Sequence, residues 1–296
     1  MTEPLRIGTR KSKLALVQTD RVVKGLEAVG IPCEVVPIST KGDWESEKNL
    51  QEFGDSGIFV HELDRAILEG RIDAAVHSMK DLPSDRPSGL VISAVLKRDS
   101  PFDFIAVEKP LEEVFVIGTS SLRRRAQLLR YYHTYPEMHV SPIRGNIDTR
   151  IAKLQAGEYD AVVVAEAALI RLGCRVHGFR LPADAFVPSP NQGAIAVVSR
   201  EGLEDTFASL NHEETAFATA VERAVLEEVG GGCILPFGAY SQGGRILAEV
   251  LSLDGKRAVR VESEVPSLEA AHAIGRELRR KASDLIEDAR KSIDGT

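Results

Sequence analysis

The stretch Ala74-Ala75-Val76-His77-Ser78-Met79-Lys80-Asp81 organises the fold of this chain. It begins as an apolar run short enough for a buried strand, turns polar, and meets Leu82-Pro83, where a regular element stops. Ligands of open α/β sheets bind just beyond the carboxyl ends of strands. Asp81 is therefore predicted to be a carboxylate that a rigid strand delivers to a binding site. The alternative is an exposed loop aspartate paired with Lys80.

Length and composition bound the class of protein. The 296 residues are many for a single core and predict two or three domains. A net charge of −7, with 43% hydrophobic residues, indicates a globular protein that does not bind nucleic acid or anionic membranes generally. Because we find no membrane-spanning run and no signal peptide, we expect a cytoplasmic location. Three widely spaced cysteines predict neither a disulfide framework nor a metal site.

An α/β domain is predicted around the opening stretch, with further strands at 5–8, 33–38 and 90–96 and helices at about 13–28 and from 59 to Gly70. Arg10 and Ser12 lie at the start of the first helix, where a cation opposes the helix dipole unless an anion is bound. The alternative is an exposed arginine in a turn. The segment 39–57 has no clear period, and loops of that length are usually functional or mobile.

The next part of the chain repeats this outline. The strand pattern at 114–119 matches the one at 5–9, a helix follows at 122–131, and 157–163 echoes 70–76. Two echoes in the same order predict two similar α/β domains that face one another, although such patterns are common. The linker 187–193 resembles a hinge, and we expect the strand after it to return to the first domain.

Arginines concentrate after the predicted strands of the second domain. They comprise Arg123, Arg124 and Arg125 in the first turn of a helix capped by Ser120 or Ser121, Arg144 in a turn with Gly145, Arg150 in the next helix, and Arg171 near the end of the helix after that. These regions should gather at one edge of the sheet. Arginine forks bind carboxylates with two parallel hydrogen bonds, so an anion site is predicted; the alternative is a set of surface ion pairs.

The C-terminal part predicts a third, smaller domain. A helix from a capping box at Asn211 and Glu214 precedes three glycines and Cys233, which is either a small buried side chain or a reactive thiol. A hairpin over 246–265 and one long amphipathic helix over 267–291 close the chain.

Four motifs occur in this order along the chain: Val76-His77-Ser78-Met79-Lys80-Asp81, Gly118-Thr119-Ser120-Ser121-Leu122-Arg123-Arg124, Arg144-Gly145-Asn146 and Gly231-Gly232-Cys233. Together they resemble the motifs of the porphobilinogen deaminase family. The resemblance implies two periplasmic-binding-protein-like α/β domains around a cleft, plus a smaller α+β C-terminal domain. The implied boundaries are 1–96 with 194–211, 101–189, and 213–296.

The resemblance also implies an activity, that of a hydroxymethylbilane synthase in tetrapyrrole (heme) biosynthesis. Such a transferase joins four porphobilinogen molecules head to tail with loss of ammonia, on a covalently bound dipyrromethane primer, and releases linear hydroxymethylbilane by hydrolysis. The expected partner is this small substrate, without nucleic acid, membrane or metal, and we expect a monomer.

Site residues follow from the same resemblance. Asp81 would stabilise the positive charge that develops on a pyrrole, and Cys233 would hold the dipyrromethane through a thioether. The implied contacts to cofactor and substrate carboxylates are Arg10, Ser12, Asp43, Lys80, Ser121, Arg123, Arg124, Arg144, Arg150, Arg171 and Gln192.

The chain departs from the family pattern in the segment 44–57, where Glu52 and Ser56 stand near positions that are often lysine. We therefore expect this segment, which begins with Trp44, to be a cover rather than a cationic clamp. Two rival classes share the expected fold. A solute-binding protein would need a signal peptide and would not explain Cys233, and an anion-sensing regulator would need a DNA-binding element, which the sequence does not show.

Overall fold

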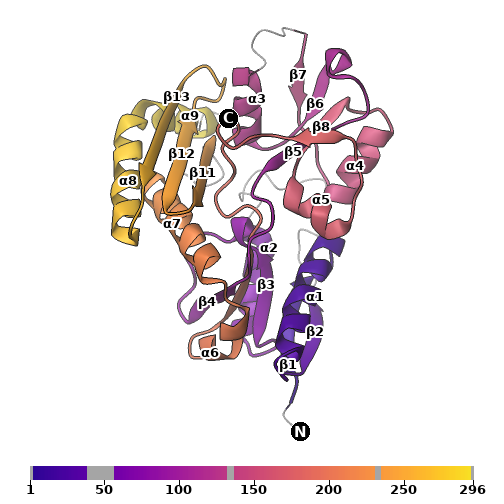
Figure 1. The fold of residues 1–296 in the computed structure, drawn as a ribbon, viewed down its shortest axis with the longest axis vertical. Coiled ribbons are helices and arrows are strands. Elements are labelled where there is room, and N and C mark those ends of the chain that lie inside the picture. Colours follow the sequence, from indigo (N-terminus) through magenta and orange to yellow (C-terminus); the bar gives the residue numbers. More distant parts are fainter. Residues whose placement is uncertain (1–2, 39–56, 132–136, 231–234, 295–296) are drawn as a thin grey trace. The chain divides into compact units, whose positions relative to one another are not determined.

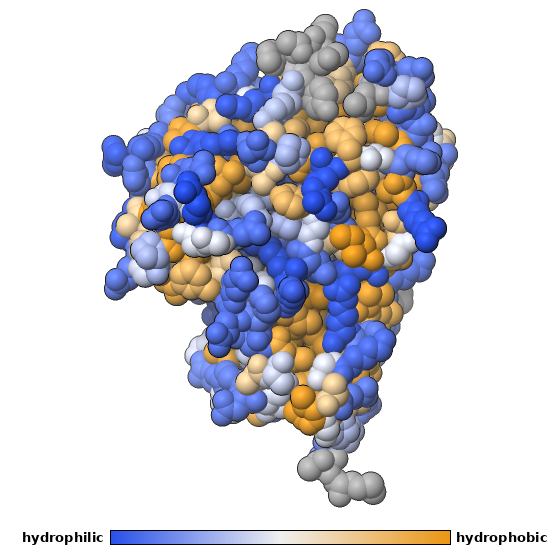
Figure 2. All heavy atoms as spheres, viewed as in Figure 1, coloured by the Kyte–Doolittle hydropathy of each residue, from blue (hydrophilic) through white to orange (hydrophobic). Residues whose placement is uncertain are grey.

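The computed structural model describes residues 3–38, 57–131, 137–230 and 235–294. The chain forms two compact units, Met1–Asp99 with Gly193–Phe217, and Ser100–Gln192 with Ala218–Thr296 (Figure 1). Figure 2 shows one face, on which hydrophilic side chains are interspersed with smaller apolar patches. Within the described ranges, no helix combines the length and the apolar character that crossing a membrane requires.

A five-stranded sheet forms the centre of the first unit. Its order is β2 (Cys33–Ile38), β1 (Leu5–Arg10), β3 (Ala74–Ser78), β10 (Ile195–Arg200) and β4 (Leu90–Val95). The first three strands are parallel, and β10 runs antiparallel between β3 and β4. The strand after the linker thus returns to the first sheet, which confirms that prediction.

Helices cover both faces of this sheet because successive strand residues point to opposite sides. Helix α1 (Lys13–Glu27) contributes Val22 and Leu26 to the core on the face of Ala74 and Val76. Helix α2 (Gly57–Leu68) packs on the other face, the side of Ala75. The carboxyl ends of β1 and β3 therefore open between two helical layers.

The second unit contains a sheet with the same plan. Its order is β7 (His139–Ser141), β6 (Val116–Gly118), β8 (Ala161–Ala165), β5 (Asp103–Val107) and β9 (Gly178–Arg180). Strands β7, β6 and β8 are parallel, and β5 is the antiparallel insertion that β10 provides in the first sheet. Helix α3 (Leu122–Tyr131) covers one face, and α4 (Ile147–Gln155) and α5 (Glu166–Leu172) cover the other. The predicted repeat of two α/β sheets is confirmed.

A three-stranded antiparallel sheet, also in the second unit, completes the fold. It consists of β11 (Phe237–Gln242), β12 (Arg245–Leu251) and β13 (Ala258–Glu264), packed with α7 (Glu213–Val229), α8 (Leu268–Lys281) and α9 (Ser283–Asp294). Shorter elements are α6 (Glu204–Phe207) and the 3-10 turns η2 (Met79–Asp81), η3 (Leu111–Glu113) and η4 (Ala208–Leu210). Two α/β sheets with a smaller α+β part confirm the predicted fold class, whereas the three domain boundaries stay a prediction.

Two local predictions were wrong. The predicted capping box fails because Asn211 Oδ1 accepts a hydrogen bond from Val95 N at 3.0 Å, and His212 Nδ1 accepts from Thr215 N instead. The predicted long C-terminal helix is two helices that meet at Ala282. Leu278, Ala282 and Leu285 are all buried in one core, so the apolar period of the sequence continues through the break and reads as a single helix.

Candidate functional site

Predicted site residues of the first unit lie at one edge of its sheet. Arg10 ends β1, Ser12 caps α1 by accepting a hydrogen bond from Ala15 N at 3.3 Å, and Lys80 and Asp81 lie in η2, directly after β3. Because β1 and β3 are parallel, their carboxyl ends meet at the same edge. The prediction that Asp81 lies just beyond a strand end is confirmed, although β1 extends to Arg10 instead of turning before it.

The turn that carries Asp81 is fixed by its backbone. Met79 N donates to Ala194 O at 3.0 Å, and Leu82 N donates back to Met79 O at 3.1 Å. The side chains of Met79 and Leu82 are buried, whereas Lys80 and Asp81 are half-buried. Two apolar anchors therefore flank two charged side chains, and the Asp81 carboxylate is presented from a turn with little backbone freedom.

In the second unit, the predicted site residues also gather at one sheet edge. Ser121, Arg123 and Arg124 follow β6, Arg144 follows β7, and Arg171 lies on α5, directly after β8. The three strands are parallel, so these residues share the carboxyl edge, as predicted. Ser121 Oγ accepts from Arg124 N at 3.4 Å, so it is Ser121 that caps α3, while Ser120 Oγ bonds to Ile143 O.

Arg123 and Arg124 are buried around a carboxylate that the sequence analysis did not identify. Arg124 donates to Asp103 Oδ1 from Nε at 3.0 Å and from Nη2 at 2.7 Å, and Arg123 Nη1 lies 2.8 Å from Asp103 Oδ2. Gln192 Nε2 also donates to Asp103 Oδ1, at 2.9 Å, and to Pro101 O. The anion that makes arginines tolerable at the start of α3 is thus part of the chain.

The neighbouring charges keep Asp103 ionised in this buried network. Burial by itself would raise the pKa of Asp103, but Arg123 and Arg124 outweigh burial and hold the pKa well below its usual range. Burial, reinforced by the charge of Arg124, lowers the pKa of Arg123. Two guanidinium groups against one carboxylate leave one net positive charge (2 − 1 = 1) at this edge.

The turn before α4 presents arginine more openly. Arg144 is exposed, and Arg150 Nε donates to Gly145 O at 2.9 Å, which holds the half-buried Arg150 against the turn. Gly145 has a φ of 107°, and a Cβ atom there would lie 2.7 Å from Thr149 Cγ2. Glycine is therefore required for the turn to bring Arg144 and Arg150 to one place. Arg171, by contrast, is 9% exposed.

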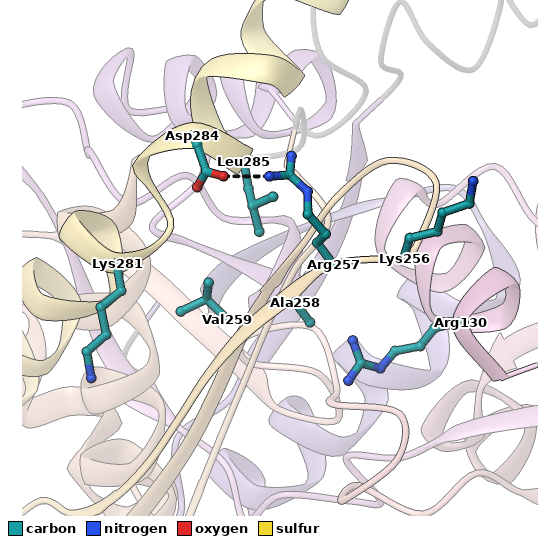
Figure 3. A pocket seen from close by; sticks show the side chains of 8 residues that line it. All are labelled: Arg130, Lys256, Arg257, Ala258, Val259, Lys281, Asp284 and Leu285. Carbon is teal, nitrogen blue, oxygen red and sulfur yellow. Dashed lines mark hydrogen bonds and ion pairs between the residues drawn. The ribbon is translucent and has the colours of Figure 1, made fainter.

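Asp43 and Cys233 lie outside the described residues, as does the segment expected to be a cover, apart from Gly57 at the start of α2. Away from these residues, the described part of the chain holds a basic hollow between α3, β13 and the helices α8 and α9 (Figure 3). Two of its cations already have acidic partners, because Arg257 bonds to Asp284 and Asp288, and Lys281 pairs with Glu277. No predicted site residue lines this hollow.

Comparison with known proteins identifies related sequences over nearly the full length. Residues 5–208 match the family model "Porphobilinogen deaminase, dipyromethane cofactor binding domain", and residues 216–284 match "Porphobilinogen deaminase, C-terminal domain". A probable porphobilinogen deaminase of Methanococcoides burtonii is 45% identical, with 98% of each chain covered. The porphobilinogen deaminase of Geobacillus kaustophilus is 42% identical over 97% of this chain and 98% of its own. Among solved structures, a periplasmic substrate-binding protein from Coxiella burnetii aligns with 74% of this chain and 96% of its own, at 13% identity and a TM-score of 0.41.

Proposed function

The chain belongs to the porphobilinogen deaminase family, and we infer that it catalyses the hydroxymethylbilane synthase reaction of tetrapyrrole synthesis. Four porphobilinogen molecules are condensed head to tail, ammonia leaves at each step, and the linear product is released by hydrolysis. The observation that carries this inference is the Asp81 turn, which presents one carboxylate at the carboxyl edge of β3.

Asp81 has the chemical properties that the condensation requires. Each condensation brings positive charge onto a pyrrole ring, and a fixed carboxylate stabilises that charge without having to reorganise. A carboxylate can also accept a hydrogen bond from the pyrrole N–H and assist proton transfer. We assign Asp81 this catalytic role, with Lys80, Arg10 and Ser12 placed at the same edge to bind acidic side chains of the substrate.

The described residues fit a dipyrromethane, whose acetate and propionate groups need cationic partners. Arg144 and Arg150 supply guanidinium groups from one turn, and the network around Asp103 keeps one net positive charge at the same edge. When bound, the dipyrromethane supplies the pyrrole on which the product is built. We assign its attachment to Cys233, and to Asp43 a part in holding it. Contacts to its carboxylates are assigned to Ser121, Arg144, Arg150 and Arg171, while Gln192 belongs to the buried network through its bonds to Asp103 and Pro101.

The buried pair Arg123 and Arg124 then has a different role from Arg144. Their guanidinium groups are already paired with Asp103, so we propose that they set the electrostatic potential and the shape of the site. More exposed arginines would then form the bidentate hydrogen bonds to substrate carboxylates. We also propose that the enzyme is a cytoplasmic monomer with the three domains given above. Light scattering that gave twice the mass of one chain would contradict the monomer.

Replacement of Asp81 tests the proposed function. Asp81→Asn should still carry the covalent cofactor and bind porphobilinogen, but its kcat should fall by about a hundredfold or more, because one preorganised electrostatic partner is lost. The matched control is Asp85→Asn, which removes an exposed carboxylate from the same segment and should leave kcat unchanged. Ammonia release is the measurement, and Asp81→Asn turnover near the wild-type rate would show that Asp81 is only a loop charge.

A further inference from the structure

A second group of buried charges lies on the α2 side of the first sheet, near the Asp81 turn. Arg86, in the segment between η2 and β4, donates from Nη2 to Asp64 Oδ1 on α2 at 2.5 Å. The two side chains are 10% and 3% exposed, so the pair is almost fully removed from water. His77 lies two residues after Ala75, whose side chain packs against α2, and therefore faces the same layer.

This ion pair is poorly explained as a source of stability. Within the described part of the chain, no hydrogen-bond partner reaches Arg86 Nε, Arg86 Nη1 or Asp64 Oδ2, and all three atoms are buried. Burial raises the pKa of Asp64 even though Arg86 opposes that shift. Buried ion pairs usually contribute little net stability compared with apolar residues of the same size, but they can select one arrangement of the chain.

The arrangement that this pair selects includes the Asp81 turn. Asp81 is held on its N-terminal side by the bond from Met79 N to Ala194 O, and Arg86 follows it by five residues. Pro83 lies between Asp81 and Arg86, and Pro87 follows Arg86. Because proline fixes φ, both stiffen this part of the chain. A bond from Arg86 to α2 therefore limits how far the C-terminal side of the turn can shift.

From this geometry we propose that Arg86, held by Asp64, is a positioning residue for the catalytic carboxylate of Asp81. This inference rests on the proposed function. It assigns Arg86 no contact with substrate, and its effect reaches the reaction through the position of Asp81. A displacement of about 1 Å at a catalytic group can cost about a hundredfold in rate, so a small shift of the turn is sufficient.

Removing the pair while keeping the fold tests the proposal. Arg86→Met leaves Asp64 buried without its cation, whereas the double variant Asp64→Leu/Arg86→Met replaces both charges with apolar groups and should regain the stability of the wild type. In holoenzyme verified by intact mass, both variants should lose about tenfold or more in kcat with KM changed far less, because an interaction made only in the transition state is weakened. Arg86→Lys, which keeps the charge, should recover part of kcat.

The control is the Arg6–Asp73 pair, which lies at the N-terminal ends of β1 and β3, away from the Asp81 turn, with Arg6 Nη2 2.7 Å from Asp73 Oδ1. Asp73→Asn should leave kcat unchanged. A double variant with the kcat of the wild type, or an Arg86→Met variant that loses activity only as its folded fraction falls, would overturn the proposal. If wild-type protein released no ammonia from porphobilinogen, the proposed function itself would fail, so the two failures are distinguishable.

Discussion

At the scale of single residues, Asp103 determines whether two buried arginines are tolerated in the second unit. It is 0% exposed and bonds to both Arg123 and Arg124. Asp103→Asn should destabilise the protein by about 3–5 kcal/mol, because it leaves buried guanidinium charge without a counter-ion. Urea unfolding measures this change. Glu262→Gln, which breaks the exposed pair with Arg245, should cost less than about 1 kcal/mol; equal effects of the two substitutions would contradict the account.

His77 makes stability depend on pH. Burial, followed by the charges of Arg86 and Arg10, lowers its pKa from 6.5 to about 3. The unfolded chain therefore binds a proton at His77 that the folded chain does not bind between about pH 3 and 6.5, and stability falls as the pH is lowered through that window.

Removing the imidazole should reduce this dependence. In His77→Gln, the slope of the unfolding free energy against pH should be smaller by up to about 1.4 kcal/mol per pH unit between pH 4 and 6. The matched control is His139→Gln, which removes an imidazole from an exposed position on β7. Urea unfolding at several pH values measures both, and parallel curves for His77→Gln and the wild type would disprove the assignment of a buried neutral imidazole.

A site residue can be predicted from sequence when the pattern that positions it is local, and is missed when its partners lie far away along the chain. Asp81 and Ser12 are predictable because each lies at the end of a strongly patterned element, and local pattern is enough to place such residues. Asp103 was missed because its partners lie about twenty residues later on α3. The available signal was chemical, since three consecutive arginines at a helix start require a nearby anion.

At the scale of elements, the turn before α4 depends on Gly145. Any side chain at Gly145 would meet both an unfavourable φ and the close Thr149 side chain. Gly145→Ala should displace Arg144 and raise KM for porphobilinogen severalfold, since positioning of a binding group is lost. Gly157→Ala is the matched control, because Gly157 has a φ of 75° at the other end of α4 but open space around it. Steady-state kinetics in which both variants behaved alike would refute this role for the turn.

Prediction of the elements themselves succeeds where hydrophobic period is strong. The helices that became α1, α2 and α3 were predicted nearly to the residue. Strands β5, β7, β9 and β11 were not predicted; of these, β7 and β9 have only three residues each, and β9 is exposed along its length. Such strands exist through pairing with a neighbour, as β9 does with β5, and a single-sequence pattern carries little of that information.

At the scale of the whole molecule, the duplicated sheet plan explains how the chain distributes its chemistry. Each α/β sheet inserts one antiparallel strand and opens its parallel carboxyl edge to charged side chains. The first sheet provides a carboxylate, Asp81, and the second provides arginines. The sequence echo predicted this duplication, but it did not predict that the second unit would include the C-terminal sheet.

We propose above all that this chain builds hydroxymethylbilane on a dipyrromethane attached to Cys233. Intact-mass measurement of purified protein tests it most directly, followed by peptide mapping and by the same measurement after porphobilinogen is added. We expect a mass increase of two pyrrole units on Cys233, and a ladder of single-pyrrole additions once substrate is present. An unmodified protein that never forms the ladder, or an adduct that maps to Cys33 or Cys174, would contradict the claim.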